Sequence, residues 1–121
     1  MKLLYCLKCV TPGRYYVGTT ELWRWHERHH EHTSKQGALW TRKHGVEKVM
    51  WTRVVADKDA KRLEDEACCL VCCEFGINGC RGGLFNIRAD VPEIPSWIVR
   101  PYFERAQDIR EATLRVNGAL S

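Results

Sequence analysis

The stretch GRYYVGTT, residues 13–20, places two adjacent tyrosines before a glycine, and it decides how the start of the chain folds. It follows the apolar, β-prone segment KLLYCLKCV (2–10) and the turn signal TPG (11–13). Two β-prone runs joined by a turn are typical of a β-hairpin. We therefore predict a hairpin whose second strand is interrupted by Gly18 directly after its most β-prone residues.

Beyond the hairpin, composition and periodicity divide the chain into helices, one strand and loops. The predicted elements are a helix over 21–33, a loop with a short helical turn over 36–45, a strand over 46–56, a helix over 57–76 with Asp59 as its N-cap, a glycine-rich loop over 77–86 and a helix over 96–116. The fold class that follows is α/β: a small three-stranded antiparallel sheet flanked by helices in the order β-β-α-β-α-α. The chain contains no repeat or linker, so we expect a single domain over 1–121 with its core at about 3–86.

Length and charge restrict the function only loosely. The 121 residues suffice for one core, and the formal net charge of +4 permits a polyanionic partner without requiring one. Lys8 interrupts the apolar N-terminus and no cleavage site follows, so we expect no signal peptide. We also expect no membrane span, and a protein of the cytoplasm or nucleus that is not secreted and keeps its cysteines as thiols.

The seven cysteines raise the possibility of a structural Zn²⁺ site. Cys6 and Cys9 form one C-x-x-C pair, but in a strand this spacing points the two side chains to opposite faces. The cluster ACCLVCC (67–73) lies in a predicted helix, where thiols pack well as small apolar groups. Packing in the core is the preferred interpretation, and zinc stays open as the alternative.

On a helical wheel, the helix over 21–33 gathers Leu22, Trp25 and His29 on one apolar face. Arg28 and His32 are four residues apart and flank that face, so both can reach a single anion. Two interpretations stay open: an anion site, or an ordinary amphipathic helix with a solvated basic side.

The helix over 57–76 provides the most informative side chain. Glu64 falls on the apolar stripe that faces the sheet, which it shares with Ala60, Ala67, Cys68, Val71 and Phe75. A carboxylate on such a stripe is costly to desolvate unless a cation pairs with it or it binds a metal. Glu64 is therefore either a functional carboxylate or one half of a structural ion pair.

Several segments resemble the motifs of the GIY-YIG nuclease superfamily. Tyr5 in LLYCL and Tyr16 in YVG resemble the two half-motifs that name it, with Leu-Leu in place of the opening Gly-Ile. RHHEH (28–32) is similar to the family's arginine followed by histidine. GALWT (37–41) and the helix with its Gly-Ile-x-x-x-Arg-Gly-Gly loop (63–85) look like those of a virus- and phage-associated branch. The likeness extends from about Leu3 to Phe85.

The resemblance implies a DNA endonuclease that hydrolyses phosphodiesters with one divalent ion, Mg²⁺ or Mn²⁺. Carried over, Glu64 would bind the metal and Arg28 would contact the scissile phosphate. Tyr5 would orient or deprotonate the attacking water, with Tyr16 and His32 completing the hydrogen-bond network. Because the pKa of a free phenol is about 10, a tyrosine base needs assistance near neutral pH.

The same resemblance suggests nucleic-acid contacts. Arg81 would grip a neighbouring phosphate, and Gly18 would leave room for one. The spacing from Gly18 is longer than in the family pattern, so Arg24 stays an alternative to Arg28. An asparagine beyond the glutamate helix has two candidates, Asn78 and Asn86.

Two other functions stay open. One is a non-cleaving nucleic-acid-binding domain of the same fold, and the other is a small zinc-binding protein. The target is not defined by the sequence. Strong site specificity would require a dimer, a partner, or the loops and last helix, because no second DNA-binding module is evident.

Overall fold

A computed structural model describes residues 1–75 and 79–82, without the side chains of residues 73 and 74. The described elements follow one another as β1 (Lys2–Lys8), β2 (Tyr15–Glu21), a 3₁₀ helix (Leu22–Arg24), α1 (Trp25–Thr33), α2 (Leu39–His44), β3 (Lys48–Val55), α3 (Asp57–Phe75) and β4 (Cys80–Arg81). The predicted helix over 96–116 and both asparagine candidates lie outside the described residues.

The sheet has the order β3-β1-β2-β4. The hairpin strands pair antiparallel, with Tyr5 opposite Gly18 and Leu7 opposite Tyr16. β3 pairs antiparallel with the other side of β1, and its register shifts between Cys6 and Leu7. β4 adds a short parallel pairing to β2 at Tyr15 and Tyr16 only. The remainder of β2, from Val17 onward, therefore has no partner from β4 on that side.

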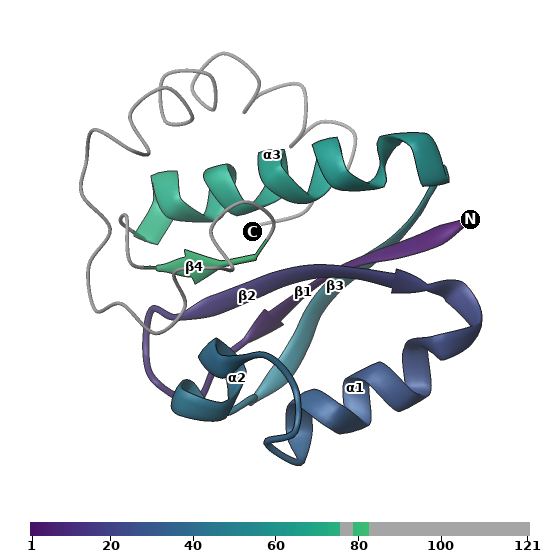
Figure 1. Cartoon of the computed structure of the whole chain (residues 1–121). Helices are drawn as coiled ribbons and strands as arrows, with labels where there is room; N and C mark the ends of the chain where they lie inside the picture. The colour runs from purple at the N-terminus through teal and green to yellow at the C-terminus, as the bar shows by residue number, and fades with distance from the viewer. Residues whose placement is uncertain (76–78, 83–121) are drawn as a thin grey trace.

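Helices cover both faces of the sheet (Figure 1). α3 lies along one face, and α1 and α2 lie on the other. Because side chains alternate between the faces of a strand, each half of the core takes every second residue. Leu4, Cys6 and Val17 pack under α3. Tyr5, Leu7 and Tyr16 belong to the second core cluster, which includes Trp40 of α2.

The hairpin, the third strand, the short helical turn and the long helix are confirmed by the structure. The three-stranded sheet is wrong by one strand, because residues 80–81 of the predicted glycine-rich loop pair with β2. α3 also begins at Asp57, so Asp59 lies in its first turn and is not the N-cap. The coarse class is mixed α/β with a four-stranded sheet.

The residues that α1 and α3 bury agree only in part with the apolar faces predicted by the helical wheels. Three small residues of α3 are buried: Ala60, Ala67 and Cys68. Phe75 is exposed, and its ring centroid lies 4.5 Å from that of Tyr15. Leu22 is exposed, because it lies in the 3₁₀ turn before α1 rather than in the α-helix. The buried residue of α1 is His32.

Within residues 1–75 and 79–82, no helix combines the length and apolar character that crossing a membrane requires.

Candidate functional site

Two phenols lie on the α1 side of the hairpin. Tyr5 and Tyr16 are diagonal neighbours on β1 and β2, and their ring centroids are 6.4 Å apart. Both side chains are almost fully covered, with exposed fractions of 1% for Tyr5 and 3% for Tyr16. Trp25 of α1 covers Tyr5 with a centroid distance of 5.0 Å. Paired tyrosines in a hairpin therefore pack against the first helix as well as against each other.

Gly18 is required by the phenol of Tyr5. A Cβ atom at Gly18 would lie 2.6 Å from the Tyr5 hydroxyl oxygen, 2.7 Å from its Cζ and 3.0 Å from the Tyr16 ring. The Tyr5 ring of the opposite strand thus occupies the space that a side chain at position 18 would need. The room beside Gly18, which the sequence suggested for a phosphate, is taken up by Tyr5.

His32 accepts a hydrogen bond from this tyrosine. The Tyr5 hydroxyl lies 2.9 Å from His32 Nε2, and His32 Nδ1 lies 3.0 Å from Thr41 Oγ1. The Thr41 hydroxyl donates its only proton to the Ala38 carbonyl oxygen, at 3.0 Å. Thr41 must therefore accept from His32, which places the imidazole proton on Nδ1 and leaves the Nε2 lone pair for the Tyr5 hydroxyl. The hydrogen bonds are therefore all donated in one direction, from Tyr5 through His32 and Thr41 to the carbonyl oxygen of Ala38.

The environment of His32 keeps its imidazole neutral. Burial, together with the smaller effect of the nearby Arg28 charge, lowers the pKa of His32 to about 4. Gly37 packs against the ring, because a Cβ there would lie 2.6 Å from Nδ1. A neutral imidazole with a free lone pair on Nε2 is a proton acceptor for the Tyr5 phenol.

We predict that His32 makes stability depend on pH. Its pKa is about 4 in the folded protein and about 6.5 in the unfolded chain, so the unfolded state binds the proton first. The stabilisation is complete above pH 6.5 and falls as the pH drops from 6.5 towards 4, by about 3 kcal/mol in total. Urea unfolding of the wild type and of His32→Gln at several pH values across this range measures the loss of unfolding free energy. The difference in unfolding free energy between the two proteins should shrink toward acid pH, and a difference constant with pH would contradict the prediction.

Arg28 brings a positive charge to the phenols. Its guanidinium acts on Tyr5, Tyr16 and His32, lowering the pKa of each. Glu31 holds it in place through an ion pair of 2.9 Å between Arg28 Nη1 and Glu31 Oε1. The Arg28 side chain keeps an exposed fraction of 27%, so part of it faces solvent. It is the cation that a bound anion at this site can reach.

Arg24 occupies a different position. Its side chain pairs with Glu27 at 3.4 Å and with Glu31 at 3.5 Å. Arg28, by contrast, lowers the pKa of both Tyr5 and Tyr16 through its charge and through a hydrogen bond. The structure thus brings Arg28 to the tyrosines and pairs Arg24 with two glutamates.

Glu64 reaches the same phenols from the opposite helix layer. Its negative charge raises the pKa of both Tyr5 and Tyr16, in addition to the larger effect of burial. α3 lies on one face of the sheet (Figure 1), whereas Tyr5 and Tyr16 belong to the core cluster that includes Trp40 of α2. The Glu64 residue is half-buried. The charges of a carboxylate on α3 and a guanidinium on α1 thus both act on the two phenols of the hairpin.

Burial dominates the titration of the phenols. It raises the pKa of Tyr5 to about 12 and that of Tyr16 even further, although the Arg28 charge opposes the change. Neither tyrosine is a phenolate near neutral pH. Tyr5 can take up a proton only if its own proton passes on, and His32 Nε2 lies at the distance to receive it.

Arg81 lies in the interior of the fold. Its side chain is fully buried, with the guanidinium stacked over Trp40 at 4.5 Å and Nη1 donating to the Cys80 carbonyl oxygen at 2.9 Å. The Trp40 indole in turn donates to the Tyr15 carbonyl oxygen, at 2.8 Å. In the structure the cation therefore packs α2 against the sheet, and the phosphate contact of Arg81 stays a prediction.

The cysteines follow the strand geometry expected for them. Cys6 packs on the α3 side and Cys9 on the α1 side, so the C-x-x-C pair points to opposite faces. Six of the seven cysteines are described, and all six are buried free thiols. Over the described ranges, no group of three or more Cys, His, Asp or Glu side chains is arranged to hold a metal ion.

Sequence reasoning missed three residues of the site. Thr41 fixes the His32 tautomer, Gly37 makes room for its ring and Glu31 orients Arg28. Glu31 could have been found from its spacing of three residues from Arg28 on the helix. Thr41 and Gly37 lie in the segment GALWT, which the resemblance had already singled out.

Comparisons of the chain with protein-family models, with curated proteins and with solved structures returned no match.

Proposed function

We propose that this chain is a metal-dependent DNA endonuclease of the GIY-YIG type, hydrolysing phosphodiester bonds with one divalent ion. The observation that carries the proposal is that Arg28, which hydrogen-bonds to Tyr5, and Glu64 of another helix both act electrostatically on Tyr5. A carboxylate, a cation and a hydrogen-bonded phenol acting together would suit attack of water on a phosphate diester.

Arg28 would bind the scissile phosphate. Its guanidinium is partly exposed and stays charged at all relevant pH values, and its planar donors match phosphate oxygens. Glu31 would keep it oriented before substrate arrives. Negative charge that develops on the phosphate would then meet a cation that needs no reorganisation.

Glu64 would hold the metal ion. A lone carboxylate fits Mg²⁺ or Mn²⁺ because these ions retain most of their waters and take substrate phosphate oxygens as further ligands. Glu64 is half-buried and its charge acts on Tyr5 as that of Arg28 does, so it would provide such a hard oxygen donor. When bound, the ion would supply Lewis-acid stabilisation of charge on the phosphate and the leaving group.

Tyr5 and His32 would handle the proton of the attacking water. The Tyr5 hydroxyl would accept that proton while its own moves to His32 Nε2, so no phenolate with a pKa of about 12 has to form. Thr41 would keep the imidazole in the required tautomer. Tyr16 would pack beside Tyr5 and restrict its ring.

One observation favours a second function, that of a non-cleaving nucleic-acid-binding domain. Tyr5 and Tyr16 are covered almost completely, which leaves Arg28 and Glu64 as the site residues that a ligand meets first. A domain that only binds nucleic acid would need the Arg28 cation but not the buried hydrogen bond between Tyr5 and His32.

A plasmid assay separates the two functions. Supercoiled plasmid, a branched oligonucleotide junction and RNA are each incubated with the purified chain and Mg²⁺ or Mn²⁺, beside a chelator control. The nuclease is expected to nick or linearise DNA with either metal and to stop with the chelator. Binding without cleavage of any substrate would favour the second function.

A further inference from the structure

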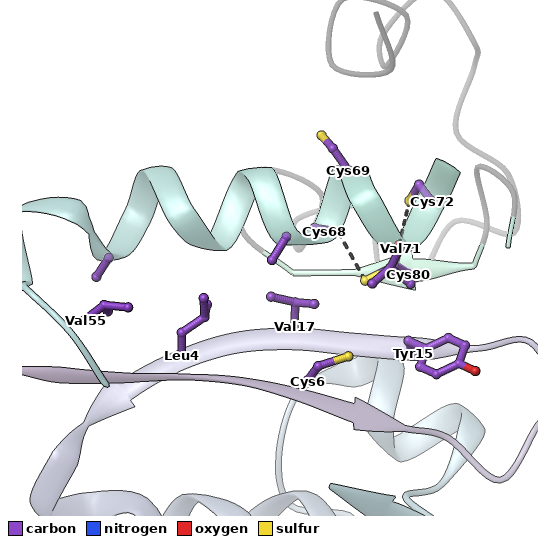
Figure 2. Close-up of a cluster of buried hydrophobic side chains, with 12 residues drawn as sticks. Leu4, Cys6, Tyr15, Val17, Val55, Cys68, Cys69, Val71, Cys72 and Cys80 are labelled. Carbon is purple, nitrogen blue, oxygen red and sulfur yellow. Dashed lines mark hydrogen bonds between the residues drawn. The ribbon is translucent and has the colours of Figure 1, made fainter. Parts of the chain in front are cut away.

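Two thiols from separate elements meet beneath α3. Cys68 lies in the middle of α3 and Cys80 lies in β4, and their sulfur atoms are 3.3 Å apart (Figure 2). Both side chains are fully buried, at 0% exposed fraction. A disulfide requires the two sulfurs to approach to about 2.05 Å, so a displacement of roughly 1 Å would suffice.

The surroundings restrict both partners. Cys80 is held by the pairing of β4 with β2, where it lies opposite Tyr15. Cys68 is one of the buried positions of α3 that pack on the sheet. Cys69, its neighbour on the same helix, points away from Cys80 (Figure 2). The contact of 3.3 Å therefore joins Cys80 to Cys68 and not to Cys69.

A third thiol lies beside the pair. Cys72 lies next to Cys80, with its sulfur 3.9 Å from the Cys80 carbonyl oxygen. A hydrogen bond from Cys68 lowers the pKa of Cys72, and the Arg81 charge adds to the effect against burial. Burial raises the pKa of both Cys68 and Cys80. Cys72 is thus the competing thiol that any test has to distinguish.

We propose that Cys68 and Cys80 are an oxidative modification site that closes to a disulfide in the presence of a small peroxide. One thiol is oxidised by the peroxide to a sulfenic acid, with release of one water from hydrogen peroxide. The sulfur of the other thiol attacks it and expels a second water. Two thiols thereby give up two electrons and two protons, and one hydrogen peroxide is reduced to two waters.

The link joins α3 to β4 covalently. β4 pairs with β2 at Tyr15 and Tyr16, so the disulfide closes a short loop on one side of the sheet. Closing a loop restricts the unfolded chain and stabilises the folded one. This site is independent of the proposed nuclease activity, and its test requires neither DNA nor metal.

Peptide mapping tests the proposal on the full chain. The protein is treated with hydrogen peroxide, blocked with N-ethylmaleimide and digested after glutamate. Cleavage after Glu66 and Glu74 separates segment 67–74 from the segment that begins at Phe75, so a link between Cys68 and Cys80 joins two peptides. Fragmentation of the joined peptides identifies the cysteine of segment 67–74 that takes part.

The expected result is one link through Cys68, lost in Cys68→Ala and in Cys80→Ala but retained in Cys69→Ala, the matched buried cysteine. The oxidised wild type should also melt about 5 °C or more above the reduced protein, with reversal by dithiothreitol. A link through Cys72 would overturn the proposal. So would a map in which every thiol still carries the maleimide after peroxide treatment, because no disulfide has then formed. The wild-type map decides the question even where an alanine variant does not fold.

Discussion

Replacing Glu64 by glutamine is expected to reduce Mg²⁺-dependent nicking of supercoiled plasmid by about 10²- to 10³-fold. The substitution keeps the size and shape of the side chain, but it replaces one acceptor oxygen by a donor NH2 group and removes the charge that would hold the ion. It also removes the negative charge that acts on Tyr5 and Tyr16. Initial rates of nicking, measured over a range of Mg²⁺ concentrations, give the effect on metal affinity and on turnover separately.

Asp65→Asn is the matched control, since Asp65 is the adjacent half-buried carboxylate of α3. It lies about 100° around the helix from Glu64. We expect its nicking rate to stay within about twofold of the wild type. Glu64→Gln cleaving as fast as Asp65→Asn would sink the metal-site assignment. Retained DNA binding by Glu64→Gln would separate loss of chemistry from loss of the fold.

The largest effect on stability is expected for Gly82→Ala. A Cβ atom at Gly82 would lie 1.9 Å from the Val17 carbonyl oxygen and 2.9 Å from its carbonyl carbon. These are backbone atoms of the central hairpin strand, so they cannot move aside as the end of a flexible side chain would. Gly82 also has a φ of +139°, a conformation that side chains rarely adopt. We expect a loss of about 4 kcal/mol or more in the free energy of unfolding.

Gly13→Ala separates the two causes of that loss. Gly13 also has a positive φ, of 72°, but among the described residues no atom beyond its two chain neighbours lies within 4 Å of the position of its Cβ. Alanine there should therefore show only the conformational cost, about 1 kcal/mol. Urea unfolding of both variants gives the difference due to steric overlap with Val17. Equal losses for the two variants would show that the close approach of Gly82 to β2 does not determine stability.

Much of the local structure follows from residue order alone. Two β-prone runs around a turn signal predicted the hairpin, alternating β-branched residues predicted the third strand, and a helical composition that stops at Gly76 predicted α3. The helical wheel placed Glu64 with the apolar stripe of that helix; in the structure Glu64 is half-buried and its charge raises the pKa of both phenols. The C-x-x-C spacing also predicted that Cys6 and Cys9 face opposite ways. These results depend on the period of one element, which neighbouring residues define.

Other features depend on contacts between segments far apart in the chain, and only the tertiary structure decided them. Gly18 interrupts its strand because Tyr5 of the partner strand lies across it, a fact set by register rather than by local sequence. Arg81 is buried on Trp40, because a two-residue strand pairs with β2 and carries it inward. The His32 tautomer depends on Thr41 in another helix. Periodicity determines which face a residue occupies, but the packing of distant segments determines what it meets there.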